Sequence, residues 1–173
     1  MWPRPCRPTS WRPRSGCSAW RSVRSTCSSR ASPSPRRQSV GKRHQARELA
    51  LKVLFQLEGT GDDPDEVLRY HASEGAATEE IANFAGQLVH GVIANREKLD
   101  AILSDTSEHW KLAQMAKVDR IILRIAVYEI AIDRRVPTKA AINESIELAK
   151  TFSGEEAGRF VNGILGRVAA TAT

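Results

Sequence analysis

The sequence predicts an all-α fold, a compact bundle of six or seven helices that begins near Lys42. Apolar residues recur at spacings of three and four almost throughout residues 42–168, which is typical of helices with one buried face. No alternating apolar and polar run of useful length indicates a β-strand. Turn and capping residues separate the apolar stripes and divide the chain into individual helices.

The first predicted helix begins at Lys42 and ends near Gly59. The turn that follows contains Asp63-Pro64, which places an N-cap and a first-turn proline before a short second helix. The apolar stripe of the first helix consists of Ala46, Leu49, Ala50, Val53, Leu54 and Leu57.

A third helix is predicted after Thr78, which is expected to cap it, with Glu79 and Glu80 in the first turn. Acidic side chains are favoured there because the helix dipole is positive at its N-terminus. After Asn95 further apolar residues either extend this helix or begin another. The periodic pattern breaks over Ser104–Trp110.

The strongest apolar stripe lies within Met115–Ile130 and predicts the central helix of the fold. Arg134–Pro137 interrupts the pattern, and a further helix runs to about Phe152. We expect a capping box next, in which Ser153 accepts from the amide of the third position and Glu156 reaches back. The final helix buries Val161, Ile164, Leu165 and Val168.

Residues 1–40 differ from the rest of the chain in composition. They hold nine of the 26 Lys and Arg and no acid, which leaves 17 cations against 20 acids, a net charge of −3, in residues 41–173. A segment so rich in Arg, Ser and Pro cannot form a packed core, so we expect a disordered extension. A mis-set start, with Val40 near the true first residue, and an organellar targeting segment are the other interpretations.

Most catalytic and metal-binding classes lack their residues in this sequence. Cys6, Cys17 and Cys27 all lie in residues 1–40, so a disulfide framework, a cysteine-ligated zinc site and a cysteine nucleophile are excluded for residues 41–173. No zinc-protease helix, phosphate loop or nucleophile elbow is present, and no run approaches the roughly 18 apolar residues of a membrane span. We expect a soluble, cytoplasmic protein that is not an enzyme and needs no cofactor.

A basic cluster lies at the start of the first predicted helix, where Lys42 and Arg43 are followed by Arg47. Arg43 and Arg47 are four residues apart and therefore share a face. Cations at a helix N-terminus oppose the dipole, and binding of a polyanion would offset that cost. The alternative is a solvated charged face with Arg47 paired elsewhere.

A second basic pair, Lys150 and Arg159, flanks the turn before the final helix. It can join the first cluster only if the two helix starts meet in space. Phe160 is in register with Val161 and Ile164, which predicts a core position. An aromatic beside cations is also typical of a platform that stacks an unpaired RNA base.

Four sequence blocks resemble the transcription antitermination factor NusB family. They are Lys42–Ala50, Val118–Glu129, Val136–Lys150 and Phe160–Leu165. The resemblance covers about residues 42–169, and the Ala-Ile-Asn-Glu and Phe-Val-Asn-Gly sequences in that order are specific to the family. It implies about seven helices in two packed helical subdomains.

The resemblance also implies a function. Members of the family pair with NusE, a small-subunit ribosomal protein, and the pair binds the boxA element of nascent RNA. With other Nus factors they keep RNA polymerase processive, notably on ribosomal RNA operons. By matching positions, the implied RNA-binding residues are Lys42, Arg43, Arg47, Lys150, Glu156, Arg159 and Phe160.

Phe55 and Asp119 match positions that face the NusE partner. Members of the family often carry two further arginines where this chain has His44 and Gln45, which reduces the phosphate contacts. One rival interpretation is the helical domain of an RNA cytosine methyltransferase, which needs a catalytic cysteine in a further domain. Another is a helical protein-binding adaptor or homodimer without an RNA role.

Overall fold

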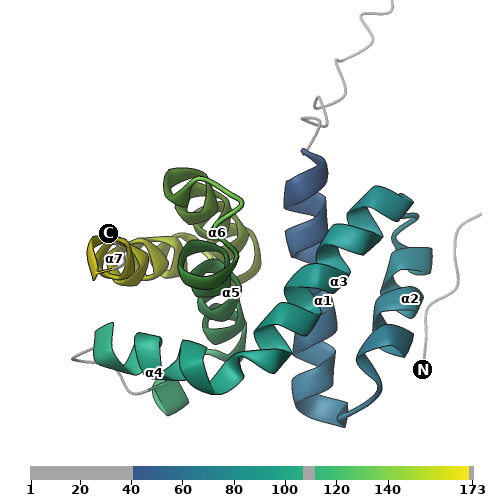
Figure 1. The fold of residues 1–173 in the computed structure, drawn as a ribbon, viewed down its shortest axis with the longest axis horizontal. Coiled ribbons are helices and arrows are strands. Elements are labelled where there is room, and N and C mark those ends of the chain that lie inside the picture. The colour runs from purple at the N-terminus through teal and green to yellow at the C-terminus, as the bar shows by residue number, and fades with distance from the viewer. Residues whose placement is uncertain (1–40, 107–111, 172–173) are drawn as a thin grey trace, which may run out of the picture. The chain divides into compact units, whose positions relative to one another are not determined.

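The structure is a computed structural model that describes residues 41–106 and 112–171. The interpretations of residues 1–40, and part of the expected break over Ser104–Trp110, lie outside these residues. Within the described ranges every regular element is a helix, so the predicted all-α fold is confirmed (Figure 1). None of these helices combines the length and apolar character needed to cross a bilayer.

The elements follow the predicted order closely. They are α1 (Lys42–Thr60), α2 (Pro64–Glu74), α3 (Glu79–Ala94), α4 (Arg96–Thr106), the 3-10 turn η1 (Leu112–Gln114), α5 (Lys117–Val127), the π-helical turn η2 (Tyr128–Asp133), α6 (Thr138–Ser153) and α7 (Glu155–Thr171).

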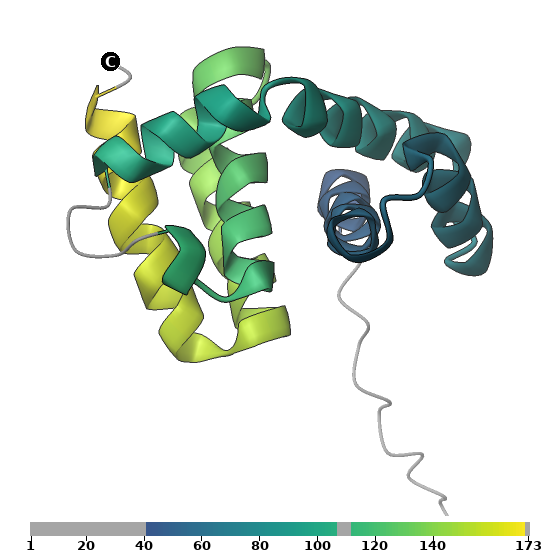
Figure 2. The same ribbon diagram turned by 90° about the horizontal axis from the view of Figure 1, so that it is seen from below.

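The helices of residues 41–171 form two groups, as the resemblance implies. Helices α1, α2 and α3 pack on one another, and α4 to α7 form the second group (Figures 1 and 2). Helix α5 belongs to the second group and also contacts α1. It is the central helix that the sequence predicts, because Ile121–Val127 is buried at every position.

Local chemistry explains where the first helices begin and end. Helix α1 ends because Gly61 adopts a left-handed conformation, with φ of 72°. Asp63 caps α2 as predicted, since its Oδ1 accepts from the amides of Asp65 at 2.8 Å and Glu66 at 3.1 Å. Asn95 ends α3 and its carbonyl accepts from Leu99, so α4 is a restart rather than an extension.

The expected capping box before the final helix is wrong. Ser153 is the last residue of α6, and Gly154, not Ser153, precedes the first residue of α7. The amide of Gly154 donates to the carbonyls of Ala149 and Lys150, which ends α6. The Glu156 carboxylate pairs with Arg159 of its own helix instead of reaching back to the start of the helix.

Candidate functional site

The first turn of α1 presents cations to solvent. Gly41 at the N-cap has no side chain to cap the helix, and the first turn contains no acid. Lys42 and Arg43 are both exposed. The Lys42 ammonium lies 2.5 Å from a carboxylate oxygen of Glu80 at the start of α3. Both of those side chains are largely exposed, so this ion pair is screened by solvent.

Arg47, one turn further along α1, is in the interior and only 1% exposed. Its Nε and Nη2 donate to the two carboxylate oxygens of Glu129 in η2, at 2.9 and 2.8 Å. Such bidentate geometry is the arrangement that offsets the desolvation of a buried ion pair. This placement corrects the expectation that Arg47 contacts RNA phosphates, because its guanidinium faces Glu129 and not solvent. The alternative that Arg47 is paired elsewhere describes it correctly.

Helix α6 also reaches the start of α1. Glu144 Oε2 lies 2.8 Å from His44 Nδ1 and 3.6 Å from Arg47 Nη1. Glu144 therefore bridges two α1 side chains. Neither acid of this network was predicted as a site residue from the sequence. The signal for Glu129 was a glutamate in register with the most apolar stripe in the chain.

The second basic group lies at the junction of α6 and α7, and its ion pairs are local. The Lys150 ammonium is 3.2 Å from Glu147 and 4.0 Å from Glu155. Arg159 pairs with Glu156 at 3.0 Å, with both side chains well exposed. The described ion pairs therefore join Lys150 and Arg159 to carboxylates of α6 and α7, whereas those of Lys42 and Arg47 join α1 to α3, η2 and α6.

Phe160 is partly buried and packs against the hydrophobic core, in agreement with its apolar spacing. Gly158 leaves room for the Lys150 side chain, because a Cβ at Gly158 would lie 2.8 Å from Lys150 Cγ. The aliphatic stem of Lys150 thus packs over the first turns of α7. The structure brings Lys150, Glu156, Arg159 and Phe160 to this one junction.

Phe55, one of the two residues expected to face a protein partner, lines an apolar groove. The Phe55 ring on α1 is 44% exposed, and the Lys117 ammonium lies 4.2 Å from its centroid. Phe55, Val118 and Phe152 line an apolar groove of about 380 Å³. Asp119 follows Val118, and its Oδ1 is buried without a hydrogen-bond partner among the described residues. Phe152 was not predicted as a site residue, because its 39% exposure follows only from the tertiary packing.

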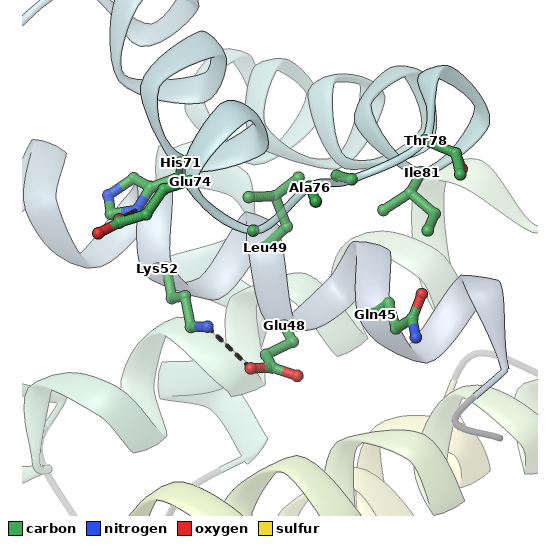
Figure 3. Close-up of a pocket in the computed structure, with 11 residues that line it drawn as sticks. Gln45, Glu48, Leu49, Lys52, His71, Glu74, Ala76, Thr78 and Ile81 are labelled. Atoms are coloured by element: carbon green, nitrogen blue, oxygen red, sulfur yellow. Dashed lines mark ion pairs between the residues drawn. The ribbon is translucent and has the colours of Figure 1, made fainter. Parts of the chain in front are cut away.

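A larger pocket of about 710 Å³ lies between α1 and the junction of α2 and α3 (Figure 3). Several of its polar side chains are paired with one another or with neighbours. Glu48 pairs with Lys52 at 2.8 Å, and His71 Nε2 lies 2.9 Å from Gln56 Oε1. Among the residues that the structure describes, no group of three or more His, Cys, Asp or Glu side chains is placed to hold a metal ion.

Comparison with known proteins identifies the family. The sequence model described as the NusB family matches residues 44–170. The chain is 47% identical over 128 residues to the transcription antitermination protein NusB of Desulfitobacterium hafniense, an alignment that covers 73% of this chain and 86% of the relative.

Solved structures agree with this assignment. The NusB of T. maritima superposes with a TM-score of 0.69 and 33% identity, over 76% of this chain and 93% of that one. A structure described as "Antitermination Factors NusB and NusE in complex with dsRNA" gives a TM-score of 0.69 over 75% of this chain and 97% of that one. At 24% identity this second likeness concerns the fold alone.

Proposed function

The chain belongs to the NusB family, and on this premise we propose that it is a transcription antitermination factor. In this proposal it binds boxA RNA together with the ribosomal protein NusE and supports processive transcription of ribosomal RNA operons. It contacts other Nus factors and RNA polymerase through that assembly. Its role is binding without a catalytic step, in the cytoplasm, where nascent RNA is made.

The observation that carries the RNA-binding part is the start of α1. Two exposed cations, Lys42 and Arg43, lie in the first turn of a helix whose dipole disfavours them. Residues 41–173, the region that contains these two cations, carry a net negative charge. Nearby RNA phosphates would offset the unfavourable placement, because they neutralise these cations and release counterions from the RNA.

The remaining site residues have distinct roles in this proposal. Lys150 and Arg159 form a second cationic contact at the junction of α6 and α7, with Phe160 near the bases. Glu156 modulates affinity there, since it already engages Arg159 at 3.0 Å. Arg47 acts from the interior, because its pairing with Glu129 fixes the first turns of α1 against η2.

The partner surface in this proposal is the groove lined by Phe55, Val118 and Phe152, and Asp119 follows Val118 in the chain. An apolar groove, with the Lys117 ammonium over the Phe55 ring, fits a protein surface better than a polyanion. NusE bound there extends the RNA-binding surface. Two modest contacts to one RNA then give a higher affinity than either protein has alone.

The test measures binding of a single-stranded boxA RNA by fluorescence anisotropy, with and without NusE. Lys42→Glu/Arg43→Glu should abolish RNA binding and leave the helical circular dichroism unchanged. Lys98→Glu/Lys139→Glu is the matched control, because it reverses two exposed charges outside the proposed interface. RNA affinity equal to wild type in the Lys42/Arg43 variant would refute the RNA interface. NusE binding without any RNA binding would indicate the protein-binding adaptor instead.

A further inference from the structure

Phe84 of α3 lies beside the basic start of α1, a placement that was not predicted from the sequence. Helices α1 and α3 pack side by side (Figure 1). The guanidinium carbon of Arg43 is 6.0 Å from the centroid of the Phe84 ring, and that of Arg47 is 5.8 Å from it. Arg43 and Arg47 share a face of α1, so both guanidinium groups lie near the same aromatic ring.

The cations of this cluster are held in two different ways. Carboxylates hold Lys42 and Arg47, through Glu80 and Glu129. Within residues 41–106 and 112–171, no carboxylate lies within ion-pair distance of Arg43, and the interaction described for its guanidinium is the one with Phe84.

The difference matters for a group that must bind phosphate. A carboxylate neutralises a guanidinium and occupies its N–H donors. An aromatic ring attracts the cation through its quadrupole and accepts none of the donors that a phosphate needs. Arg43 therefore keeps its positive charge and its donors while its side chain is held near one position.

Phe84 itself is well supported. Its ring is half-buried and packs against the hydrophobic core. On the α1 side it meets Arg47, which Glu129 holds through two hydrogen bonds in the interior. A ring fixed in this way lowers the conformational entropy that Arg43 loses when it binds a ligand.

We propose that Phe84 is a positioning residue for RNA binding, which holds the Arg43 guanidinium toward solvent for contact with a phosphate of the RNA backbone. This inference rests on the proposed RNA-binding function and adds a residue of α3 to it. Phe84 acts through Arg43 and makes no contact with RNA of its own.

A double-mutant cycle tests this, with the protein in complex with NusE and a single-stranded boxA RNA as the probe. Phe84→Leu should weaken RNA binding about two- to fivefold, the range expected for an exposed cation–π contact. Phe84→Tyr, which keeps the ring, should bind as wild type does. In an Arg43→Ala background, Phe84→Leu should cause no further loss. Thermal unfolding checks that each variant is folded, and Phe84→Met replaces Phe84→Leu if the latter is not.

Each result has a separate meaning. An equal loss from Phe84→Leu with and without Arg43 would overturn the inference, because it would show that Phe84 contacts RNA itself or acts only through stability. Binding by Phe84→Leu equal to wild type would overturn it as well. Failure of the wild-type complex to bind RNA would overturn the proposed function and this inference together.

Discussion

Arg47 on α1 and Glu129 in η2 form a bidentate ion pair, with N–O distances of 2.9 and 2.8 Å, between two residues that are 1% and 0% exposed. The pair joins the group of α1, α2 and α3 to the group of α4 to α7. It lies directly behind the exposed cations at the start of α1. Arg47, which was expected to bind RNA, thus supports the start of α1 from the interior through a structural ion pair.

Loss of one member of this pair should be far more harmful than loss of both. Glu129→Ala removes both hydrogen-bond acceptors of the buried Arg47 guanidinium and leaves it only Glu144, 3.6 Å away, so we expect a loss of about 3–5 kcal/mol in the free energy of unfolding. Arg47→Met/Glu129→Leu should recover most of it, because no unpaired charge remains. Urea unfolding followed by circular dichroism measures both. The control is Glu156→Ala, whose exposed pair should contribute less than about 1 kcal/mol. A loss below this control value for Glu129→Ala would contradict the argument.

Gly91 should not tolerate a side chain, although it lies in a helix. A Cβ at this position of α3 would collide with the Tyr128 ring of η2. Gly91→Ala should therefore destabilise the protein by about 1–3 kcal/mol, the usual cost of overpacking. Gly166→Ala in α7 is the matched control, since nothing lies within 4 Å of its Cβ position. That variant should gain roughly 0.5–1 kcal/mol from helix propensity. Thermal melts showing the same sign for both changes would contradict this explanation.

The partner groove predicts that Phe55→Ala weakens NusE binding. A half-exposed aromatic ring over an apolar groove has the character of an interface anchor, and we expect a loss of about 1–2 kcal/mol, or roughly tenfold in Kd. Isothermal titration calorimetry with NusE measures it. Tyr70→Ala removes another exposed ring, 59% exposed on α2, and should leave the affinity unchanged. Equal losses of NusE affinity from Phe55→Ala and Tyr70→Ala would show that NusE does not bind at this groove.

The second cationic group predicts a change in salt dependence. Arg159→Ala removes one expected phosphate contact, so the slope of log K against log salt for single-stranded RNA should decrease in magnitude by roughly 0.7. Stability should change little, because Arg159 is exposed and its ion pair with Glu156 is local. Lys98→Ala is the control for a general loss of charge. A slope identical to wild type would remove Arg159 from the proposed interface.

Much of the fold was predictable because its determinants are local. Asp63 and Pro64 begin α2, the apolar stripe after Met115 marks the central helix, and Arg134–Pro137 separates η2 from α6. The capping box at Ser153 was wrong for a reason that is also close in sequence: α6 continues through Ser153, and Gly154 ends it. The π-helical turn at Tyr128–Asp133 has no counterpart in a 3.6-residue pattern and was not predicted.

The sequence by itself determined the helical class, the positions of the helices and the family, because periodicity, caps and family-specific blocks are contained in short segments. Only the tertiary structure decided which cation of the first cluster faces solvent. Arg43 and Arg47 share a helix face and have the same chemistry, but Glu129 lies 82 positions away from Arg47 and meets it only when η2 packs on α1. Burial and pairing depend on that packing, so one arginine became an interior support and the other stayed at the surface beside Phe84.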